Sequence, residues 1–293
     1  MPRIARIPTA LGIALLIPQL LLPALAASPV WKVEKAGQSF YLGGTLHLLT
    51  PSDYPLPDAF HQAYQRSERI VFETDIDAMK TPEGQARLVQ LLSFEDGTRL
   101  DSVISDDTYQ AVKAFFEQRG VPFDQISRYK PGMVSILMTV IELKRIGVTT
   151  VGVDNYYNDR AIEDGKARGY LETVAQQLDF IANMGKGRED EMLRYSLKET
   201  GQLTEQWQAL KFTWREGDLD QLEAMAAKPL QDRFPEVYDA MLVTRNRAWL
   251  PQIEAMAQTA ETELILVGAL HLAGKDGLLS MLEERGYRIT ALP

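Results

Sequence analysis

Hydrophobic residues cluster in short runs near both ends of the chain, a pattern typical of β-strands. A turn at residues 35–38 separates the first two runs and predicts a β-hairpin. The run Ile70–Phe72 is strongly β-prone, which predicts a buried strand that ends near Glu73. In chain order, the predicted strands are Trp31–Glu34, Ser39–Leu42, Arg69–Thr74, Glu263–Val267 and Tyr287–Leu292.

The middle of the chain repeats its hydrophobic residues at helical spacing instead. Met133, Ile136, Leu137 and Val140 follow this spacing, and Gly147 ends the pattern. The predicted helices are Asp58–Glu68, Asp106–Arg119, Pro131–Gly147, Asn155–Ala167, Val174–Asn183, Glu189–Thr200, Pro235–Thr259 and Lys275–Arg285.

Strands at both ends with helices between them predict one sheet that both chain ends build. The sequence therefore favours an α/β (α+β) fold, in a single domain of residues 27–293 with a helical subdomain inserted at about residues 100–260. No linker rich in serine, glycine or proline divides this part of the chain.

Residues 1–26 have the pattern of a signal peptide. Two arginines form a positive region, an apolar run follows at residues 11–26, and Ala24-Leu25-Ala26 supplies the small residues of a cleavage site. Two prolines interrupt the run, so it falls short of the roughly 20 clean apolar residues of a membrane span. We expect export to the periplasm or secretion, with no membrane span after cleavage. An uncleaved anchor is the alternative.

Composition restricts both the partners and the chemistry. The chain contains no cysteine, which excludes disulfides, thiolate metal ligands and a cysteine nucleophile, so any metal site must use nitrogen and oxygen ligands. The formal net charge is −9, and cleavage would make it more negative because residues 1–26 carry no acidic residue. This charge argues against nucleic acid or an anionic membrane surface as a partner.

Two of the three histidines lie in the same local sequence. The segments Gly44–Leu48 and Gly268–Leu272 share the pattern Gly-x-Leu-His-Leu, and each follows a predicted strand. Glycine is expected to permit a tight turn there, which lets the histidine point back over the edge of the sheet. Glu73 also lies at the end of a strand, and sites in open α/β sheets lie outside such strand ends. If the three strands are parallel neighbours, His47, Glu73 and His271 converge on one point.

Two imidazoles and one carboxylate are a common ligand set for a catalytic divalent ion, with one position left for a water nucleophile. Zinc, manganese or cobalt would each suit such a site. In a second arrangement Glu73 is the general base, and the third ligand is Asp75 or a water. The remaining histidine, His61, lies among polar residues of a predicted helix and is expected at the surface. No nucleotide-binding or serine-hydrolase motif is present.

The chain also resembles the TraB/GumN family, whose relatives include pheromone-shutdown proteins and Tiki-type metalloproteases. The resemblance covers nearly the whole chain after residue 26. It rests on the Trp31 strand, Tyr41–His47, Val71–Asp75, Gly152–Asp154, Leu171–Thr173 with Gln176, Arg245-Asn246 and Val267–Leu272. It implies a metal site at His47, His271 and Glu73. Asn155 stands where the family often has an acidic residue, which argues against a metal role for that segment.

The resemblance draws attention to Arg245 and Asn246 on one predicted helix, and to Asp154 and Glu172. In a hydrolase, Arg245 would stabilise a developing oxyanion, and Asn246 would orient the oxyanion or the water. Alternatively, Arg245 forms a structural ion pair with Glu172 or Asp154.

Together these features favour a metal-dependent hydrolase, namely a peptidase of the TraB/GumN/Tiki type that acts on a peptide or peptide-like envelope substrate. The second hypothesis is a non-catalytic periplasmic protein that binds a metal or haem through its two histidines. The family name adds a third, an accessory factor in exopolysaccharide export. The sequence leaves the oligomeric state open.

Overall fold

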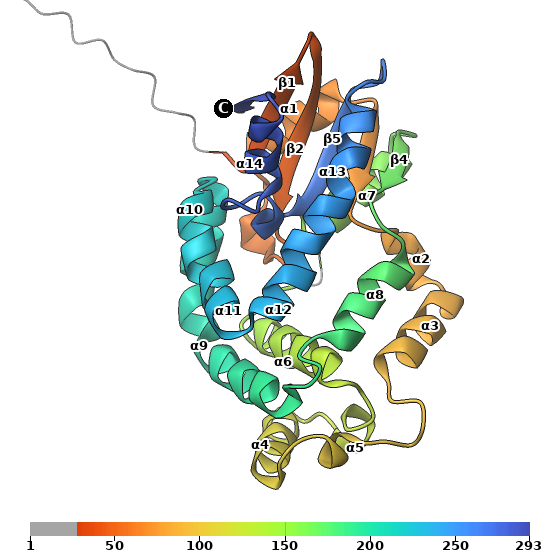
Figure 1. Cartoon of the computed structure of the whole chain (residues 1–293), viewed down its shortest axis with the longest axis vertical. Coiled ribbons are helices and arrows are strands. Elements are labelled where there is room, and N and C mark those ends of the chain that lie inside the picture. The colour runs from red at the N-terminus through yellow and green to blue at the C-terminus, as the bar shows by residue number, and fades with distance from the viewer. Residues whose placement is uncertain (1–27, 150) are drawn as a thin grey trace, which may run out of the picture.

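The computed structural model describes residues 28–149 and 151–293, and a six-stranded sheet forms its upper part in Figure 1. The strand order is β4-β3-β5-β2-β1-β6. Strands β4, β3, β5 and β2 run parallel, whereas β1 and β6 are each antiparallel to a neighbour. The strands are β1 (Val30–Lys35), β2 (Gln38–Thr45), β3 (Arg69–Phe72), β4 (Ala167–Tyr170), β5 (Glu263–Gly268) and β6 (Arg288–Ala291).

The two ends of the described chain meet in this sheet, because β1 pairs with both β2 and β6. This confirms the predicted α/β (α+β) fold with one sheet built from both ends. The signal peptide predicted at residues 1–26 lies outside the described residues. Among the residues that are described, no helix combines the length and hydrophobicity that a membrane span requires.

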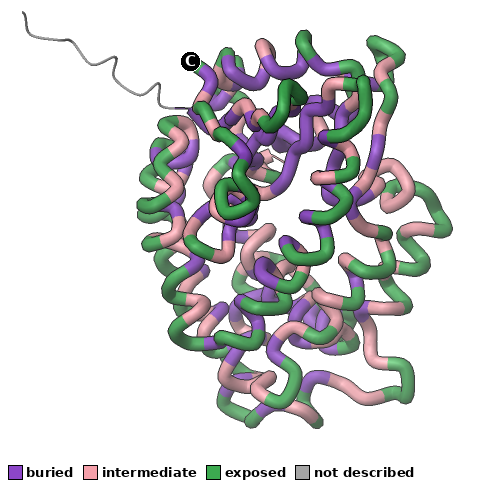
Figure 2. The backbone as a smooth tube through the Cα atoms, turned by 45° about the horizontal axis from the view of Figure 1, so that its top comes forward, coloured by how far each residue is buried: buried purple, intermediate pink, exposed green. Residues whose placement is uncertain are grey.

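Helices cover both faces of the sheet. Ile70 and Leu264 pack in a core with α1 (Asp58–Arg66) and α7 (Val153–Glu163). Val71 and Ile265, their neighbours along β3 and β5, pack in a second core with α13 (Thr244–Met256) and α14 (Leu278–Glu284). Strands that are buried on both faces are typical of parallel sheets. Figure 2 accordingly shows long buried stretches along the strands.

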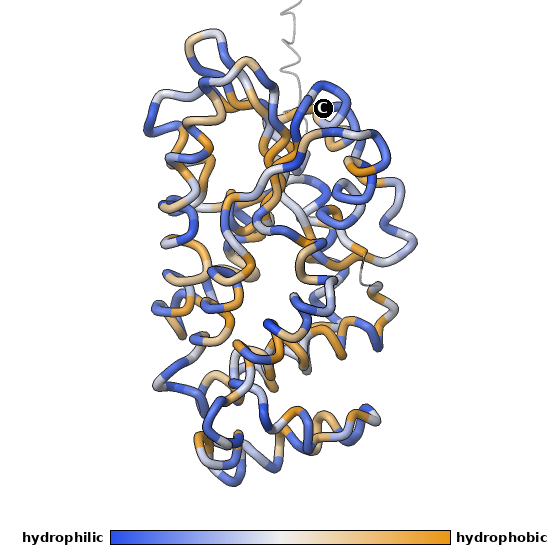
Figure 3. The backbone as a smooth tube through the Cα atoms, turned by 90° about the vertical axis from the view of Figure 1, so that its right-hand side faces the viewer, coloured by the Kyte–Doolittle hydropathy of each residue, from blue (hydrophilic) through white to orange (hydrophobic). Residues whose placement is uncertain are grey.

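A second group of helices forms a separate core below the sheet, around Val112, Phe116, Val134 and Leu193. These helices are α4 (Asp106–Glu117), α5 (Phe123–Ile126), α6 (Pro131–Arg145) and α9 (Glu189–Arg215). Hydrophobic residues alternate with hydrophilic ones along the helices, as Figure 3 shows in orange and blue. Helix α9 runs from this group to the level of the sheet, so it joins the two parts of the molecule.

The remaining helices connect these two parts. They are α2 (Ile76–Lys80), α3 (Pro82–Leu92), α8 (Val174–Asn183), α10 (Leu219–Leu222), α11 (Lys228–Arg233) and α12 (Pro235–Tyr238). A π-helical turn at Asp239–Val243 joins α12 to α13. The single helix predicted at Pro235–Thr259 is therefore three consecutive helical pieces.

Some expectations about elements were wrong, and some elements were missed. The segment at Ala167–Tyr170, where the prediction ended a helix, is strand β4, because it pairs with β3 in the sheet. The region predicted as a helical subdomain thus contains a strand. Helix α9 continues past the predicted end at Thr200, because Trp207 and Trp214 are buried against other parts of the fold. Helices α2, α3, α5, α10 and α11 were not predicted.

Candidate active site at the strand ends

The C-terminal ends of β2, β3 and β5 meet at one edge of the sheet, because the three strands are parallel neighbours. His47, Glu73 and His271 follow these three strands. A Cβ placed on Gly268 would stand 3.3 Å from Glu73 Oε1, 3.4 Å from His47 Nε2 and 3.7 Å from His271 Cδ2. The structure therefore brings together the three residues that the sequence singled out.

Glycine provides space and a donor at this point rather than a tight turn. Neither Gly44 nor Gly268 has a positive φ, so the turn expected from the motif is not the reason for glycine. The Gly268 N–H donates to Glu73 Oε1 at 2.7 Å. A side chain at Gly268 would crowd the atoms that face one another at the site.

His47 is held in place through its Nδ1 atom. This atom lies 2.8 Å from Asp154 Oδ2, and Thr45 Oγ1 donates to Asp154 Oδ1 at 2.9 Å. Asp154 is buried at the start of α7, which approaches so closely that a side chain at Gly152 would collide with the His47 backbone. The Asp154 carboxylate raises the pKa of His47, whose side chain is 60% exposed. The other ring nitrogen, Nε2, faces the site.

His271 is buried and held in a similar way. Its Nδ1 lies 2.7 Å from Asn246 Oδ1, while the Asn246 amide nitrogen donates to the carbonyls of His271 and Asp276. Nδ1 therefore carries the proton, and Nε2 is left as an acceptor. Burial lowers the pKa of His271 to about 3, so the ring is neutral at neutral pH. The Trp249 ring packs against it, with centroids 4.5 Å apart.

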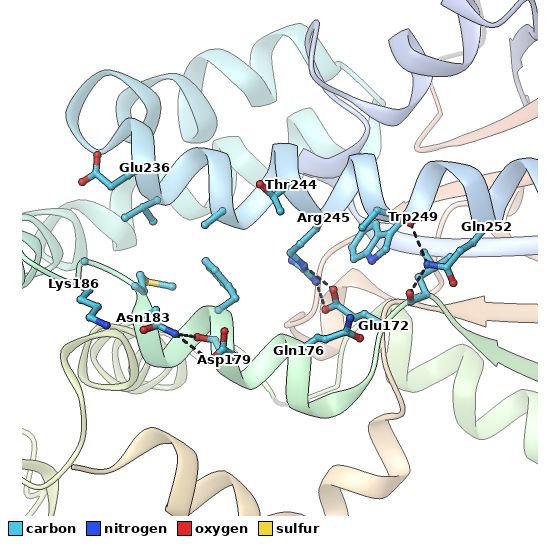
Figure 4. Close-up of a pocket in the computed structure, with 17 residues that line it drawn as sticks. Glu172, Gln176, Asp179, Asn183, Lys186, Glu236, Thr244, Arg245, Trp249 and Gln252 are labelled. Atoms are coloured by element: carbon cyan, nitrogen blue, oxygen red, sulfur yellow. Dashed lines mark hydrogen bonds and ion pairs between the residues drawn. The ribbon is translucent and has the colours of Figure 1, made fainter. Parts of the chain in front are cut away.

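Arg245 lies between the acidic residues and His271. Its Nη2 donates to Glu73 Oε2 and to Glu172 Oε1, both at 2.7 Å, and its Nε donates to Glu172 Oε2 at 3.1 Å. Its Nη1 donates to His271 Nε2 at 3.0 Å. Figure 4 shows the pair with Glu172 across a groove between α8 and α13. The ion pair expected between Arg245 and Glu172 is thus present.

The charges around Glu73 keep it ionised. Burial works to raise its pKa, but the positive charges of His271, which is protonated only at acid pH, of Arg245 and of His47 outweigh burial and lower the pKa to about 2. Glu172 differs, because burial raises its pKa despite the same arginine. Glu73 is therefore a carboxylate at neutral pH, available as a ligand or as a proton acceptor.

The other predicted residues lie as follows. Asn246 hydrogen-bonds to the ring and the carbonyl of His271, and its orientation of an oxyanion or a water stays a prediction. Asp75, the alternative third ligand, caps α2 by accepting from the N–H groups of Asp77 and Ala78. His61 lies on α1, apart from the site, and its ring bonds to the Gln65 amide.

Two cavities open beside the site, and both border α8. One of about 390 Å³ is lined by His47, Glu73, Arg245 and His271, with apolar side chains of α8 and of the π-helical turn before α13. The other, of about 370 Å³, extends from His47 and Glu73 between α3, α6 and α8. The site is thus open to a ligand larger than an ion.

A sequence profile of the TraB/PrgY/gumN family matches residues 29–291, which is nearly the whole chain. The chain belongs to this family. No curated protein and no solved structure matches this TraB/PrgY/gumN protein.

The donor atoms at the site of this TraB/PrgY/gumN protein, two imidazole nitrogens and a carboxylate, are of the types that bind a divalent cation. Both imidazoles have Nδ1 fixed by a neighbour, as metal-ligating histidines do, and His271 Nε2 lies 3.8 Å from Glu73 Oε1. Within the described part of the chain, no three ligand side chains stand ready in ligand geometry. Arg245 donates to two of the three, so a cation would require its guanidinium to withdraw from His271 while staying paired with Glu172.

Sequence reasoning missed several residues of the TraB/PrgY/gumN site. Thr45 supports Asp154 from the variable position of the motif, where the second copy has Ala269. Gln177 approaches Glu73 Oε2 at 3.4 Å, whereas Gln176 of the family pattern caps α8. The sequence carries no signal that would have separated these two glutamines.

Proposed function

We propose that this protein is a metal-dependent hydrolase that acts on a peptide or peptide-like envelope substrate. His47, His271 and Glu73 would hold the cation, which is zinc, manganese or cobalt. When bound, such a cation would polarise a carbonyl group and activate a water molecule. The observation that carries the proposal is that two imidazoles face one carboxylate with both Nδ1 atoms already hydrogen-bonded.

The chain's own residues supply the rest of the chemistry. Glu73, ionised at neutral pH, can accept a proton if it is not itself a ligand. Glu172 holds the Arg245 guanidinium by two hydrogen bonds at the edge of the site. A guanidinium in this place stabilises negative charge that develops on a carbonyl oxygen. Asp154 and Asn246 keep the imidazoles in one orientation.

The cavities and the predicted export support a peptide as substrate. Two cavities with apolar walls meet at His47 and Glu73, so groups on both sides of a reacting bond can be bound. Residues 1–26 predict that the protein works in the periplasm or outside the cell, where envelope peptides are its candidate substrates.

The second candidate function is a non-catalytic metal-binding protein. It is favoured by the hydrogen bond from Arg245 to Glu73, because a carboxylate that is paired with a guanidinium is a weaker proton acceptor for catalysis. The two candidates differ in whether metal-loaded protein turns over a substrate.

The test combines elemental analysis of purified protein with activity on a diverse peptide library, with and without chelator. We expect stoichiometric metal and cleavage that the chelator abolishes. His47→Ala and His271→Ala should lose the metal, whereas His61→Ala, a histidine outside the site, should keep both metal and activity. Metal without cleavage of any peptide would favour the second candidate, and absence of metal binding would contradict both.

Glu73→Gln separates the two roles of the carboxylate. If Glu73 is a ligand, the variant should lose metal affinity together with turnover. If it is the general base, metal content should stay near normal while activity falls about 10²- to 10⁴-fold. Unchanged metal content with unchanged activity would remove Glu73 from the mechanism.

A further inference from the structure

A hydroxyl group at the site has no partner. Thr74 follows Glu73 directly in the chain and is 4% exposed. In the described part of the chain, nothing forms a hydrogen bond with its Oγ1. A threonine hydroxyl donates one hydrogen bond and accepts two, and burying it without a partner destabilises the folded state. Such a group calls for an explanation, and a bound ligand provides one.

Thr74 lines the cavity of about 370 Å³ that extends from His47 and Glu73, which we call the Thr74 cavity. Its polar residues gather at the site end. The rest of the wall is apolar and comes from α2, α3, α6 and α8, including Met79, Leu88, Leu92, Met133, Ile136 and Ile181.

The apolar wall of the Thr74 cavity determines which chemical groups of a ligand can bind there. A charged group would lose its hydration against these side chains without gaining a partner, so the apolar part of the cavity excludes it. A large apolar side chain would instead be removed from water, and the two flexible methionines can adjust to its shape. The free hydroxyl at the site end suits a polar group attached to that side chain, such as a peptide N–H or C=O.

We propose that Thr74 is a substrate-positioning residue, and that the Thr74 cavity binds a large apolar side chain of a peptide substrate. The peptide group beside that side chain forms a hydrogen bond with the Thr74 hydroxyl. Because Thr74 is adjacent to Glu73, this bond places the substrate backbone next to the reacting groups. The inference rests on the hydrolase function proposed for the same site.

The first test is Thr74→Val, which replaces the hydroxyl with a methyl group of similar size. Without ligand, the variant should melt about 2–4 °C higher than the wild type, because an unpartnered buried hydroxyl is removed. Its affinity for an apolar peptide should fall about fivefold, the scale of one lost hydrogen bond. In the control Thr200→Val, the lost hydroxyl donates to Ser196 O at 2.8 Å, so stability should fall and peptide affinity should stay unchanged. A lower melting temperature for Thr74→Val, or unaltered peptide affinity, would overturn the inference.

The second test measures side-chain preference with labelled peptides that carry alanine, leucine, phenylalanine, lysine or aspartate at each position in turn. Binding is measured with chelator present, so that no turnover occurs. At one position, leucine and phenylalanine should bind at least about tenfold more tightly than alanine, lysine or aspartate, since a large buried apolar side chain contributes roughly 1.5–3 kcal/mol. Met133→Phe should reduce this preference by filling the cavity, whereas Met225→Phe, outside the cavity, should not.

Equal affinity for alanine and leucine would overturn the Thr74 cavity as a peptide subsite. The same conclusion would follow if a fatty acid displaced the peptides and Met133→Phe left the side-chain preference unchanged. Cleavage of the same peptides with metal present reports on the proposed function separately. Binding with the expected preference but without cleavage would contradict the hydrolase and leave the binding site supported.

Discussion

At the scale of single residues, the site is built from side chains with divided tasks. Asp154 and Asn246 each bind the Nδ1 of one histidine, which leaves Nε2 facing Glu73. Arg245 neutralises the charge of the buried carboxylates Glu73 and Glu172. Because buried charges need partners, the guanidinium would compete with a bound metal ion for the same negative charge.

Arg245→Met should therefore strengthen metal binding. The variant leaves Glu73 and Glu172 without a counter-charge, which destabilises the metal-free protein and increases the gain on binding a cation. We expect the zinc dissociation constant to fall about tenfold, the equivalent of about 1.4 kcal/mol, with a larger rise in melting temperature on adding zinc. Calorimetric titration measures the first and thermal melting the second.

Arg119→Met is the matched control, because Arg119 also pairs with a buried glutamate, Glu142, but away from the site. It should destabilise the protein without changing zinc affinity. Weaker zinc binding by Arg245→Met would show instead that the guanidinium supports the metal site.

At the scale of elements, helix α9 fixes the segment that carries His47. Near its C-terminal end, Lys211 Nζ lies 2.6 Å from Asp53 Oδ1, and these side chains are only 8% and 9% exposed. In the next turn, Trp214 Nε1 donates to the Gly44 carbonyl at 2.7 Å. These contacts hold both ends of the segment between β2 and α1, so the long helix matters for the position of the imidazole.

Asp53→Asn should lower the free energy of unfolding by about 3 kcal/mol at pH 7, because it leaves the Lys211 ammonium buried without a counter-charge. Burial works to raise the pKa of Asp53, but hydrogen bonds from Lys211 and Thr50 outweigh it and lower the pKa. The folded pKa thus lies below the unfolded value of about 3.9. The contribution of the ionised Asp53 to the free energy of unfolding is therefore fully present above about pH 4. It is lost as the pH falls through the folded pKa.

Urea denaturation at pH 7 and at pH 3 measures this effect. The difference in stability between wild type and Asp53→Asn should be smaller at pH 3. The control is Asp232→Asn, since Asp232 pairs with Lys228 at the surface and its loss should change stability little. An Asp53→Asn protein as stable as the wild type at pH 7 would contradict this role of the buried pair.

At the scale of the whole molecule, the sheet order brings distant segments to one edge. Strand β5, from near the end of the chain, lies between β2 and β3, from near its beginning. The helical region between them returns to the sheet through β4 and contributes Arg245 and Asn246 from α13. The site is therefore complete only when the whole described chain is folded.

The predicted signal peptide at residues 1–26 determines where the whole protein is found. Expressed in a Gram-negative host, the protein should be recovered from the periplasm without residues 1–26. Cell fractionation gives the location, and mass spectrometry of the intact protein gives the N-terminus. A protein recovered with its leader intact and in the membrane fraction would show that the segment is an anchor.

The sequence alone determined the fold class, the position of most strands, and the expectation that His47, Glu73 and His271 lie together at the strand ends. Hydrophobic periodicity and the repeated motif are local properties, which one sequence displays without its tertiary contacts. Strand β4 and the full length of α9 were decided by the tertiary structure, because pairing and packing against distant segments overrode local preference. The partners of the site residues were decided in the same way. Asp154 lies 107 residues from His47, and Arg245 lies 172 residues from Glu73, so only the folded chain brings each charge to its partner.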